Sequence, residues 1–185
     1  MTFQRTKTKL VVMVHEGSGH TNLKAIQNAI NDGRVHAEIL KIISDKEDVS
    51  ILKEISVDYI CLAGWKKIIP NEFVIKYSNK ILNIHPGLIP DAPNGSVENP
   101  DGTSALWNKG MYGDNAIQNF LDQKATFAGS SIHFLTSDFD FGPVLGRTFE
   151  KIEINDNVKS LYSRLKQKEN KLYVEVLEKL SSNVR

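Results

Sequence analysis

The first 85 residues alternate between short apolar runs and segments with helical periodicity. The apolar runs are rich in β-branched residues and predict four strands, over Lys9–Val14, His36–Ser44, Asp58–Gly64 and Lys80–His85. The segments between them predict helices, over Thr21–Gly33, Asp48–Ser56 and Pro70–Asn79. Nearly continuous apolar strands separated by helices are typical of a parallel sheet that is covered on both faces.

The pattern changes after the fourth strand. Residues 88–124 are rich in Gly, Pro, Asn and Asp, with one helix-like patch at Asp114–Leu121. Two further strands are expected to form an antiparallel pair, over Ala128–Thr136 and Gly142–Ile154. A long amphipathic helix follows over Asp156–Leu180, with Asp156 as its expected N-cap. We therefore predict one domain over 1–185, a Rossmann-like α/β fold whose mostly parallel open sheet has helices on both faces and ends in the antiparallel strand pair and the long helix.

Charge and composition narrow the range of partners. The 185 residues include 23 Lys and Arg and 22 Asp and Glu, and a net charge of +1 gives no electrostatic reason to bind nucleic acid. The single cysteine, Cys61, cannot form an intrachain disulfide, which fits a reducing compartment. No apolar run approaches the roughly 20 residues of a membrane helix. We expect a cytoplasmic protein that acts on small molecules, as a monomer or homodimer, without nucleic acid or a membrane.

The turn between the first strand and the first helix, HEGSGHTNL, is a candidate phosphate site. Its glycines let the backbone approach a ligand, and the start of a helix offers free N–H groups and a positive dipole end. The residues with these properties are Gly17, Ser18, Gly19, Thr21 and Asn22. The turn is neither a Walker loop nor the dinucleotide-binding glycine pattern. A tight turn that binds nothing is the alternative.

A sharper signal lies at the end of the fourth strand, in the sequence NIHP. Asn83 and His85 are two residues apart, so their side chains project to the same face of the strand. They lie at its carboxyl end, where open α/β sheets place their active sites. An amide can donate to a developing oxyanion, and an imidazole can move a proton near neutral pH. The alternative is a strand-end polar pair with no catalytic role.

Two carboxylates would extend such a site if the fold brought them near it. Asp140 lies in the turn TSDFDFGP, and close to His85 it would orient the imidazole and raise its pKa. Otherwise it is a solvated turn residue. Glu169 lies within the apolar stripe of the last helix, where an unpaired carboxylate is costly. A structural ion pair or the hydroxyl groups of a ligand would each account for it.

These features occur together, in this order, in a family that the chain resembles, the folate-dependent formyltransferases. The resemblance rests on the glycine loop, the Leu62-Ala63-Gly64 segment, Asn83 to Pro86, Asp140 to Pro143 and the helix around Glu169. It implies a formyl transfer from 10-formyltetrahydrofolate to a primary amine, without a metal. In the members most like this chain, the amine belongs to glycinamide ribonucleotide, in purine biosynthesis.

The chain also departs from the family pattern. His20 is an apparent insertion in the glycine loop, and the stretch between Ser44 and Asp58 is short enough for the sheet to lack one strand. The connection from Ile89 to Phe127 is longer than the family's. Other replacements are Lys66–Lys67 for a Met-Arg-like pair, and Asn170 and Val174 for His and Pro.

The resemblance assigns a role to each candidate residue. Asn83 would donate to the oxyanion, His85 would stabilise that oxygen or shuttle the proton of the amine, and Asp140 would hold His85. The residues implied for the phosphoribosyl acceptor are Gly17, Ser18, Gly19, Thr21, Asn22, Pro86 and Glu169. Those implied for the folate are Trp65, Lys66, Ile68, Ile69, Phe139 and Asp140.

Three other interpretations stay open. Within the family, the chain could be a sugar-nucleotide N-formyltransferase or a formyltetrahydrofolate hydrolase, which uses the same Asn, His and Asp with water as the acceptor. It could be a folate-binding protein without activity. The early glycines alone suggest a nucleotide-binding oxidoreductase, but the third glycine and a clear ribose-binding acid are missing.

Overall fold

A computed structural model describes residues 6–183, which form a single six-stranded sheet. The strands are β1 (Thr8–Val14), β2 (Ala37–Ser44), β3 (Tyr59–Ala63), β4 (Ile81–His85), β5 (Phe127–Phe134) and β6 (Val144–Lys151). Their order across the sheet is β2-β1-β3-β4-β5-β6. The first four pair in parallel, β5 is antiparallel to β4, and β6 is antiparallel to β5. The predicted α/β class and the antiparallel C-terminal pair are confirmed.

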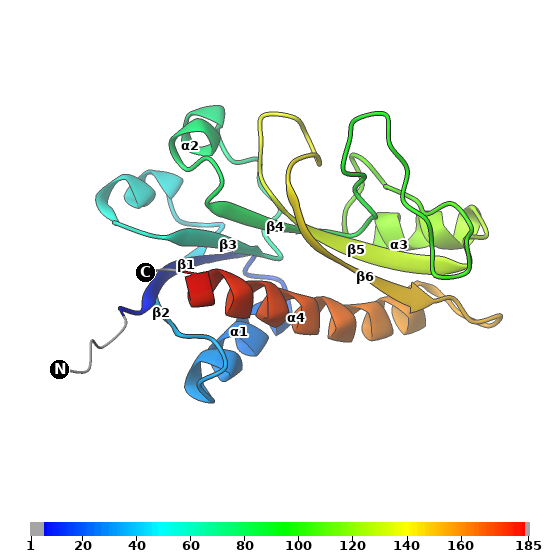
Figure 1. Cartoon of the computed structure of the whole chain (residues 1–185), viewed down its shortest axis with the longest axis horizontal. Coiled ribbons are helices and arrows are strands. Elements are labelled where there is room, and N and C mark those ends of the chain that lie inside the picture. The colour runs from blue at the N-terminus through cyan, green and yellow to red at the C-terminus, as the bar shows by residue number, and fades with distance from the viewer. Residues whose placement is uncertain (1–5, 184–185) are drawn as a thin grey trace.

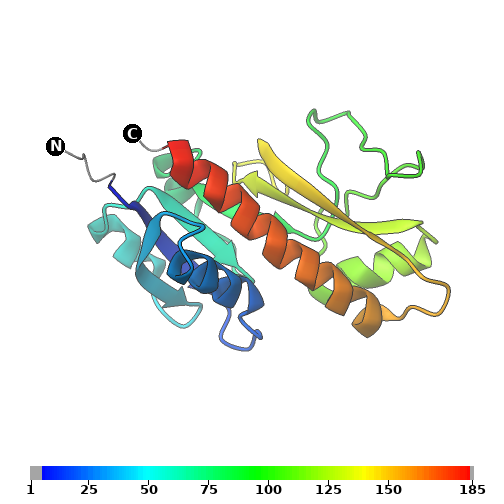
Figure 2. The ribbon, with the colours of Figure 1, turned by 60° about the horizontal axis from the view of Figure 1, so that its bottom comes forward.

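Helices cover both faces of this sheet (Figures 1 and 2). They are α1 (Thr21–Asn31), the short 3-10 helix η1 (Val49–Glu54), α2 (Asn71–Lys76), α3 (Gly113–Asp122) and α4 (Val158–Asn183). Alternation along β1 divides the core, because successive side chains of a strand point to opposite faces. Leu10 and Val12 pack with α1 and α4, whereas Val11 and Met13 pack with η1 and α2. No helix within residues 6–183 is long and apolar enough to cross a membrane.

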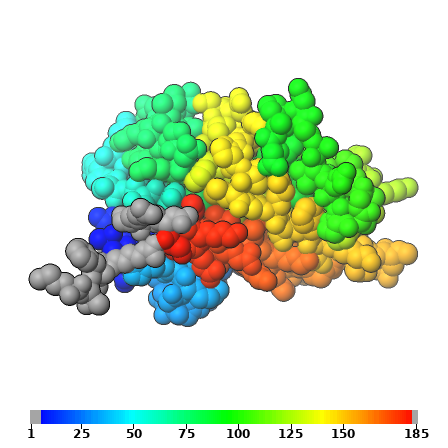
Figure 3. Space-filling view, in the orientation of Figure 1, coloured from blue at the N-terminus to red at the C-terminus, as the bar shows by residue number. Residues whose placement is uncertain are grey.

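The long connection between β4 and β5 is anchored by a third apolar cluster. Ile117 and Phe120 of α3 are fully buried against Leu161 and Leu165 of α4 and Ala128 of β5. In the space-filling view, the green part of this connection and the yellow turn after β5 lie next to each other (Figure 3), and the Trp107 side chain joins them by a hydrogen bond to Asp140. The connection therefore belongs to the packed domain.

The start of the last helix differs from the prediction. Asp156 is not its N-cap, because α4 begins at Val158 and the side chain of Asn157 accepts a hydrogen bond from the backbone N–H of Ser160 (3.0 Å). Asp156 instead binds the guanidinium of Arg164 (Oδ2–Nη2 2.6 Å). This contact holds the pKa of the Asp156 carboxyl well below its usual range. Both residues favour the cap position, but Asn157 caps α4 and Asp156 pairs with Arg164 instead.

Candidate active site

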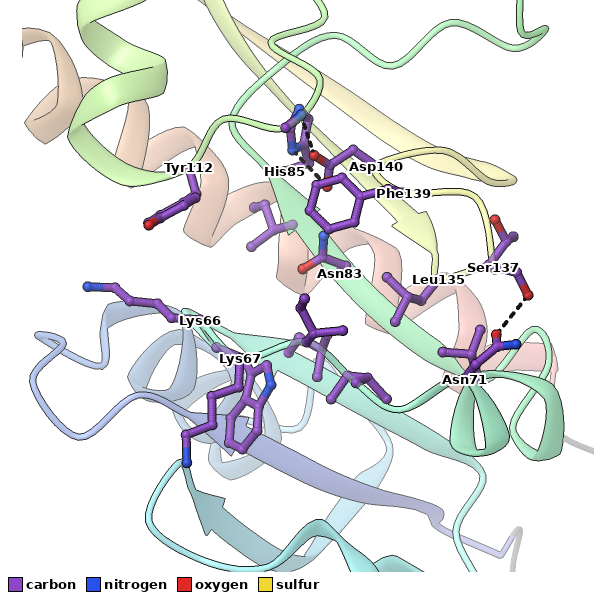
Figure 4. A pocket seen from close by; sticks show the side chains of 18 of the residues that line it. Lys66, Lys67, Asn71, Asn83, His85, Tyr112, Leu135, Ser137, Phe139 and Asp140 are labelled. Carbon is purple, nitrogen blue, oxygen red and sulfur yellow. Dashed lines mark hydrogen bonds and ion pairs between the residues drawn. The ribbon is translucent and has the colours of Figure 1, made fainter.

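A cleft of about 590 Å³ opens at the carboxyl ends of β3 and β4 (Figure 4). Helix α2 and three connections form the rest of its wall: the segment after β3, the segment before α3 and the turn after β5. Large apolar side chains on this wall are left in solvent, namely Ile68 (83% exposed), Tyr112 (65%) and Phe139 (60%). A mostly apolar cleft of this size with a few polar groups suits a small organic ligand.

Asn83, His85 and Asp140 lie together in this cleft, the arrangement that the family resemblance implied. Nδ1 of His85 is 3.5 Å from Oδ1 of Asp140, and the two side chains face each other in Figure 4. His85 is 2% exposed and Asp140 is 12% exposed. The turn after β5 therefore delivers its carboxylate to the end of β4, although the two residues are far apart in the chain.

The other ring nitrogen of His85 contacts a backbone oxygen. Nε2 lies 2.7 Å from the carbonyl oxygen of Trp107, which can only accept, so Nε2 carries a hydrogen and donates. Nδ1 is then the nitrogen that gains or loses a proton. Burial lowers the pKa of His85, and Asp140, the Trp107 carbonyl and Glu169 oppose that shift.

His133 is a site residue to which the sequence analysis assigned no role. It lies directly opposite Asn83 in the β4–β5 pairing and is fully buried. Its Nδ1 donates to the carbonyl of Phe134 (3.1 Å), so its Nε2 accepts from Nδ2 of Asn83 (3.2 Å). Burial and the neighbouring His85 lower the pKa of His133 to about 4. A histidine in an apolar strand was the available signal, but only the strand register shows what it touches.

The residues expected to hold the folate all line the cleft: Trp65, Lys66, Ile68, Ile69, Phe139 and Asp140. Pro86 lines it as well. The indole nitrogen of Trp65 is buried and has no hydrogen-bond partner among residues 6–183. An unpaired buried donor is costly unless a ligand or water satisfies it, so this wall has the character of a binding surface.

The glycine loop lies outside this cleft. None of Gly17, Ser18, Gly19, Thr21 and Asn22 is among the cleft's lining residues. The loop follows β1, and His20 takes the left-handed backbone conformation (φ 52°) immediately before α1. The hydroxyl of Ser18 is buried and lacks a partner in the described part of the chain. A role of this loop in phosphate binding stays a prediction.

Glu169 has partners both on its own helix and on the sheet. It is 2% exposed, and its carboxylate accepts from the hydroxyl of Ser130 (2.6 Å) and from the ammonium of Lys166 (2.6 Å). One residue further along α4, Asn170 accepts from Nδ2 of Asn22 (3.0 Å), which places the start of α1 against this part of the helix. The structural ion pair is therefore present, and contact with a ligand's hydroxyls stays a prediction.

An amide donor, an imidazole and a carboxylate thus meet at the carboxyl end of β4, beside an apolar cleft in an α/β domain. Such a site can stabilise charge on a carbonyl oxygen while a proton moves. Within residues 6–183, no three His, Cys, Asp or Glu side chains are grouped to hold a metal.

A model of the formyl transferase family matches residues 47–177, a range that contains Asn83, His85, Asp140 and Glu169. The chain belongs to the formyl transferase family.

Individual relatives agree with this assignment. The chain is similar to the chloroplastic phosphoribosylglycinamide formyltransferase of Arabidopsis thaliana, with 28% identity over 92% of the chain, and it spans 64% of that protein's length. It is also similar to the formyltetrahydrofolate deformylase of Bacillus subtilis, with 25% identity over 63% of the chain and 33% of that protein. The solved phosphoribosylglycinamide formyltransferase of Bacillus halodurans has the same fold (TM-score 0.77, 21% identity, covering 96% of this chain and 97% of that one).

Proposed function

We propose that this chain transfers the formyl group of 10-formyltetrahydrofolate to the amine of glycinamide ribonucleotide. The observation that carries the proposal is the placement of Asn83 and the His85–Asp140 pair in one apolar cleft. Formyl transfer requires a donor for the developing oxyanion, a group that moves a proton and an apolar place for a ring system. Membership of the formyl transferase family and the name of the plant relative support the same reaction.

The cleft fits the formyl donor. Its volume of about 590 Å³ lies within the range of pockets that bury small organic ligands. The exposed faces of Ile68 and Phe139 supply apolar contact for the pterin and benzoyl rings. The indole N–H of Trp65, which has no partner among the described residues, supplies a hydrogen-bond donor. Lys66 lines the same wall and can attract the carboxylates of the glutamate tail.

The chemistry follows from the hydrogen bonds of the polar groups. The amine attacks the formyl carbon, a C–N bond forms, and the carbonyl oxygen becomes an oxyanion. Asn83 commits one amide hydrogen to His133 and has a second to donate to that oxygen. The bond to N10 then breaks, tetrahydrofolate leaves, and the proton lost by the amine compensates for the proton gained by N10.

His85 handles that proton through Nδ1, because Nε2 is committed to the Trp107 carbonyl. Asp140 lies 3.5 Å from Nδ1 and stabilises the imidazolium while it exists. The acid–base group and its counter-ion are thus both in place beside the oxyanion donor.

The acceptor's phosphoribosyl group belongs on the opposite side of β4, between the glycine loop and α4. The start of α1 offers free N–H groups to a phosphate, and the hydroxyl of Ser18, which has no partner within residues 6–183, can join them. Glu169 uses two acceptor positions on Ser130 and Lys166, and a carboxylate has about four. The remaining positions can accept from ribose hydroxyls, and the Asn22–Asn170 bond keeps the two regions adjacent.

One assay separates this function from its alternatives. The protein is incubated with 10-formyltetrahydrofolate, and deformylated folate is followed with glycinamide ribonucleotide, with an amino-sugar nucleotide and with no acceptor. Release only with glycinamide ribonucleotide is the expected result. Release without acceptor would make the chain a hydrolase, and release only with the sugar nucleotide would change the acceptor. If 10-formyltetrahydrofolate binds but no deformylated folate appears under any of these conditions, the chain is a folate-binding protein without activity. The cytoplasmic location and the monomer or homodimer state stay predictions.

A further inference from the structure

Five residues of the long connection, Leu106–Gly110, cross the end of β4 beside the candidate catalytic residues. The backbone N–H of Leu88 donates to the Leu106 carbonyl (2.9 Å), and His85 donates to the Trp107 carbonyl (2.7 Å). The approach is close enough to require a glycine at position 87, since a Cβ there would lie 1.8 Å from the Trp107 oxygen. Leu106–Gly110 is therefore fitted to the end of this strand.

Leu106–Gly110 also holds Asp140. The indole N–H of Trp107 donates to the backbone carbonyl of Asp140 (2.9 Å), and the backbone N–H of Gly110 donates to its Oδ2 (2.8 Å). The indole ring lies 5.7 Å from the ring of Phe141, the next residue of the turn. One short stretch of chain thus sets the position of both the imidazole and its carboxylate.

Asn108 anchors this stretch. It is 6% exposed and holds a left-handed backbone conformation (φ 55°). Its Nδ2 donates to the carbonyls of Pro86 (3.0 Å) and Ala116 (3.0 Å), and its Oδ1 accepts from Asn119 (2.8 Å). Three hydrogen bonds therefore tie it to the end of β4 and to α3, which is itself packed against α4.

We infer that Asn108 is a positioning residue for the formyl transfer, an inference that rests on the proposed function for its kinetic consequence. Its side chain fixes the position of Leu106–Gly110. The Trp107 carbonyl can then accept the hydrogen of His85 Nε2, and the Gly110 N–H holds Asp140 opposite Nδ1. The imidazole then exchanges protons at one nitrogen only, with its counter-ion already in place. Asn108 itself reaches the site only through these neighbours.

The charges around His85 set the direction of the expected change. Asp140 faces it from the turn after β5, Glu169 acts on it from α4, and His133 lies near it on β5. Releasing Leu106–Gly110 loosens the Trp107 carbonyl and Asp140, both of which raise the pKa of His85. Glu169 and His133 are held by other contacts. The pKa of His85 therefore falls when the anchor is removed.

The test is Asn108→Gly, because glycine accepts the left-handed conformation and removes only the side chain. Asn79→Gly is the matched control, since Asn79 has the same conformation (φ 56°) but is exposed in the turn between α2 and β4. For Asn108→Gly we expect kcat to fall about 10- to 100-fold through misplacement of the reacting groups, with nearly unchanged KM values. The limb of the pH–rate profile that reports His85 should move to lower pH. The control should match the wild type.

Ring-nitrogen NMR titration of His85 supplies a readout that needs no substrate. A lower pKa of His85 in Asn108→Gly, with no change in Asn79→Gly, supports the inference. It does so even if the wild type transfers no formyl group, because that failure would contradict only the proposed function. A folded Asn108→Gly protein with a reduced melting temperature but an unchanged His85 titration overturns it. If Asn108→Gly does not fold, Trp107→Phe removes the bond to the Asp140 carbonyl and keeps an aromatic ring. An unchanged titration there would contradict the premise that Leu106–Gly110 positions Asp140 for His85.

Discussion

The stability of this protein in acid should depend on His133. The residue is fully buried, and its neutral form both donates to Phe134 and accepts from Asn83. Protonation of Nε2 would remove that acceptor and place a charge in the core. The perturbation is His133→Gln, because the glutamine side chain can place an oxygen acceptor near the position of Nε2 without titrating.

The magnitude follows from the difference in pKa between the folded and unfolded states. The pKa of His133 is about 4 in the folded protein, against an ordinary value of 6.5. Between these values the unfolded chain binds a proton that the folded chain does not, so stability is lost as the pH falls from about 6.5 towards 4. At about 1.4 kcal/mol per unit, the wild type should lose about 2–3 kcal/mol through this residue between pH 7 and pH 4.5.

Urea unfolding followed by far-ultraviolet circular dichroism, at pH 7 and at pH 4.5, measures this loss for both proteins. Between pH 7 and pH 4.5 the free energy of unfolding should fall less for His133→Gln than for the wild type. The difference between the two losses should be about 2–3 kcal/mol, the contribution of the histidine. His85 is present in both proteins, so only the part of its titration that comes from its repulsion with His133 differs between them. Equal losses in the two proteins would refute a neutral, hydrogen-bonded His133. His133→Leu, which has no acceptor, should in addition lower kcat more than His133→Gln does.

Three further predictions concern other groups of the site and core. Asn83→Ala should lose about 10²- to 10³-fold in kcat in a steady-state assay, as expected when one oxyanion donor is removed; near-normal turnover would exclude that role. Glu169→Gln should weaken acceptor binding about tenfold and leave donor binding unchanged, because a charged hydrogen bond becomes neutral; calorimetric titration of each ligand decides this, and equal weakening of both would indicate a structural role. Cys61 should resist alkylation at pH 8 until the protein is unfolded, since burial raises the pKa of its thiol to about 12; mass spectrometry detects the adduct, and labelling of the native protein would contradict this.

Strand and helix periodicity predicted most of this fold because each signal is local. The alternation along β1 sends Val11 and Val12 to opposite faces, and the apolar runs of the other strands mark the sheet directly. Boundaries were less predictable because several residues compete for them. Asp156 and Asn157 both favour the N-cap, and the choice depends on Arg164, which lies in the second turn of the helix.

The residues of the site likewise differ in whether a local sequence signal predicts their position. The i, i+2 spacing of Asn83 and His85 is enough to place both side chains in one cleft. The approach of Asp140 to His85 has no local signal, and its prediction rested on the family resemblance. Among the partners of Glu169, Lys166 lies three residues before it on the same helix, a spacing that the sequence shows. Ser130 has no such signal, because it lies on a strand whose register is set by pairing across the sheet.

The connection between β4 and β5 shows why such contacts leave little trace in a sequence. The bond from His85 to Trp107 spans 22 residues and uses a backbone oxygen, which every residue carries, so no side-chain pattern marks it. What the sequence does retain is the set of residues that make the approach possible. Gly87 leaves room for the Trp107 carbonyl, and Asn108 tolerates the left-handed turn that presents it. In a segment without periodicity, the small residue and the Asn at the turn therefore carry the information about the site, and they do so through the backbone geometry that they permit.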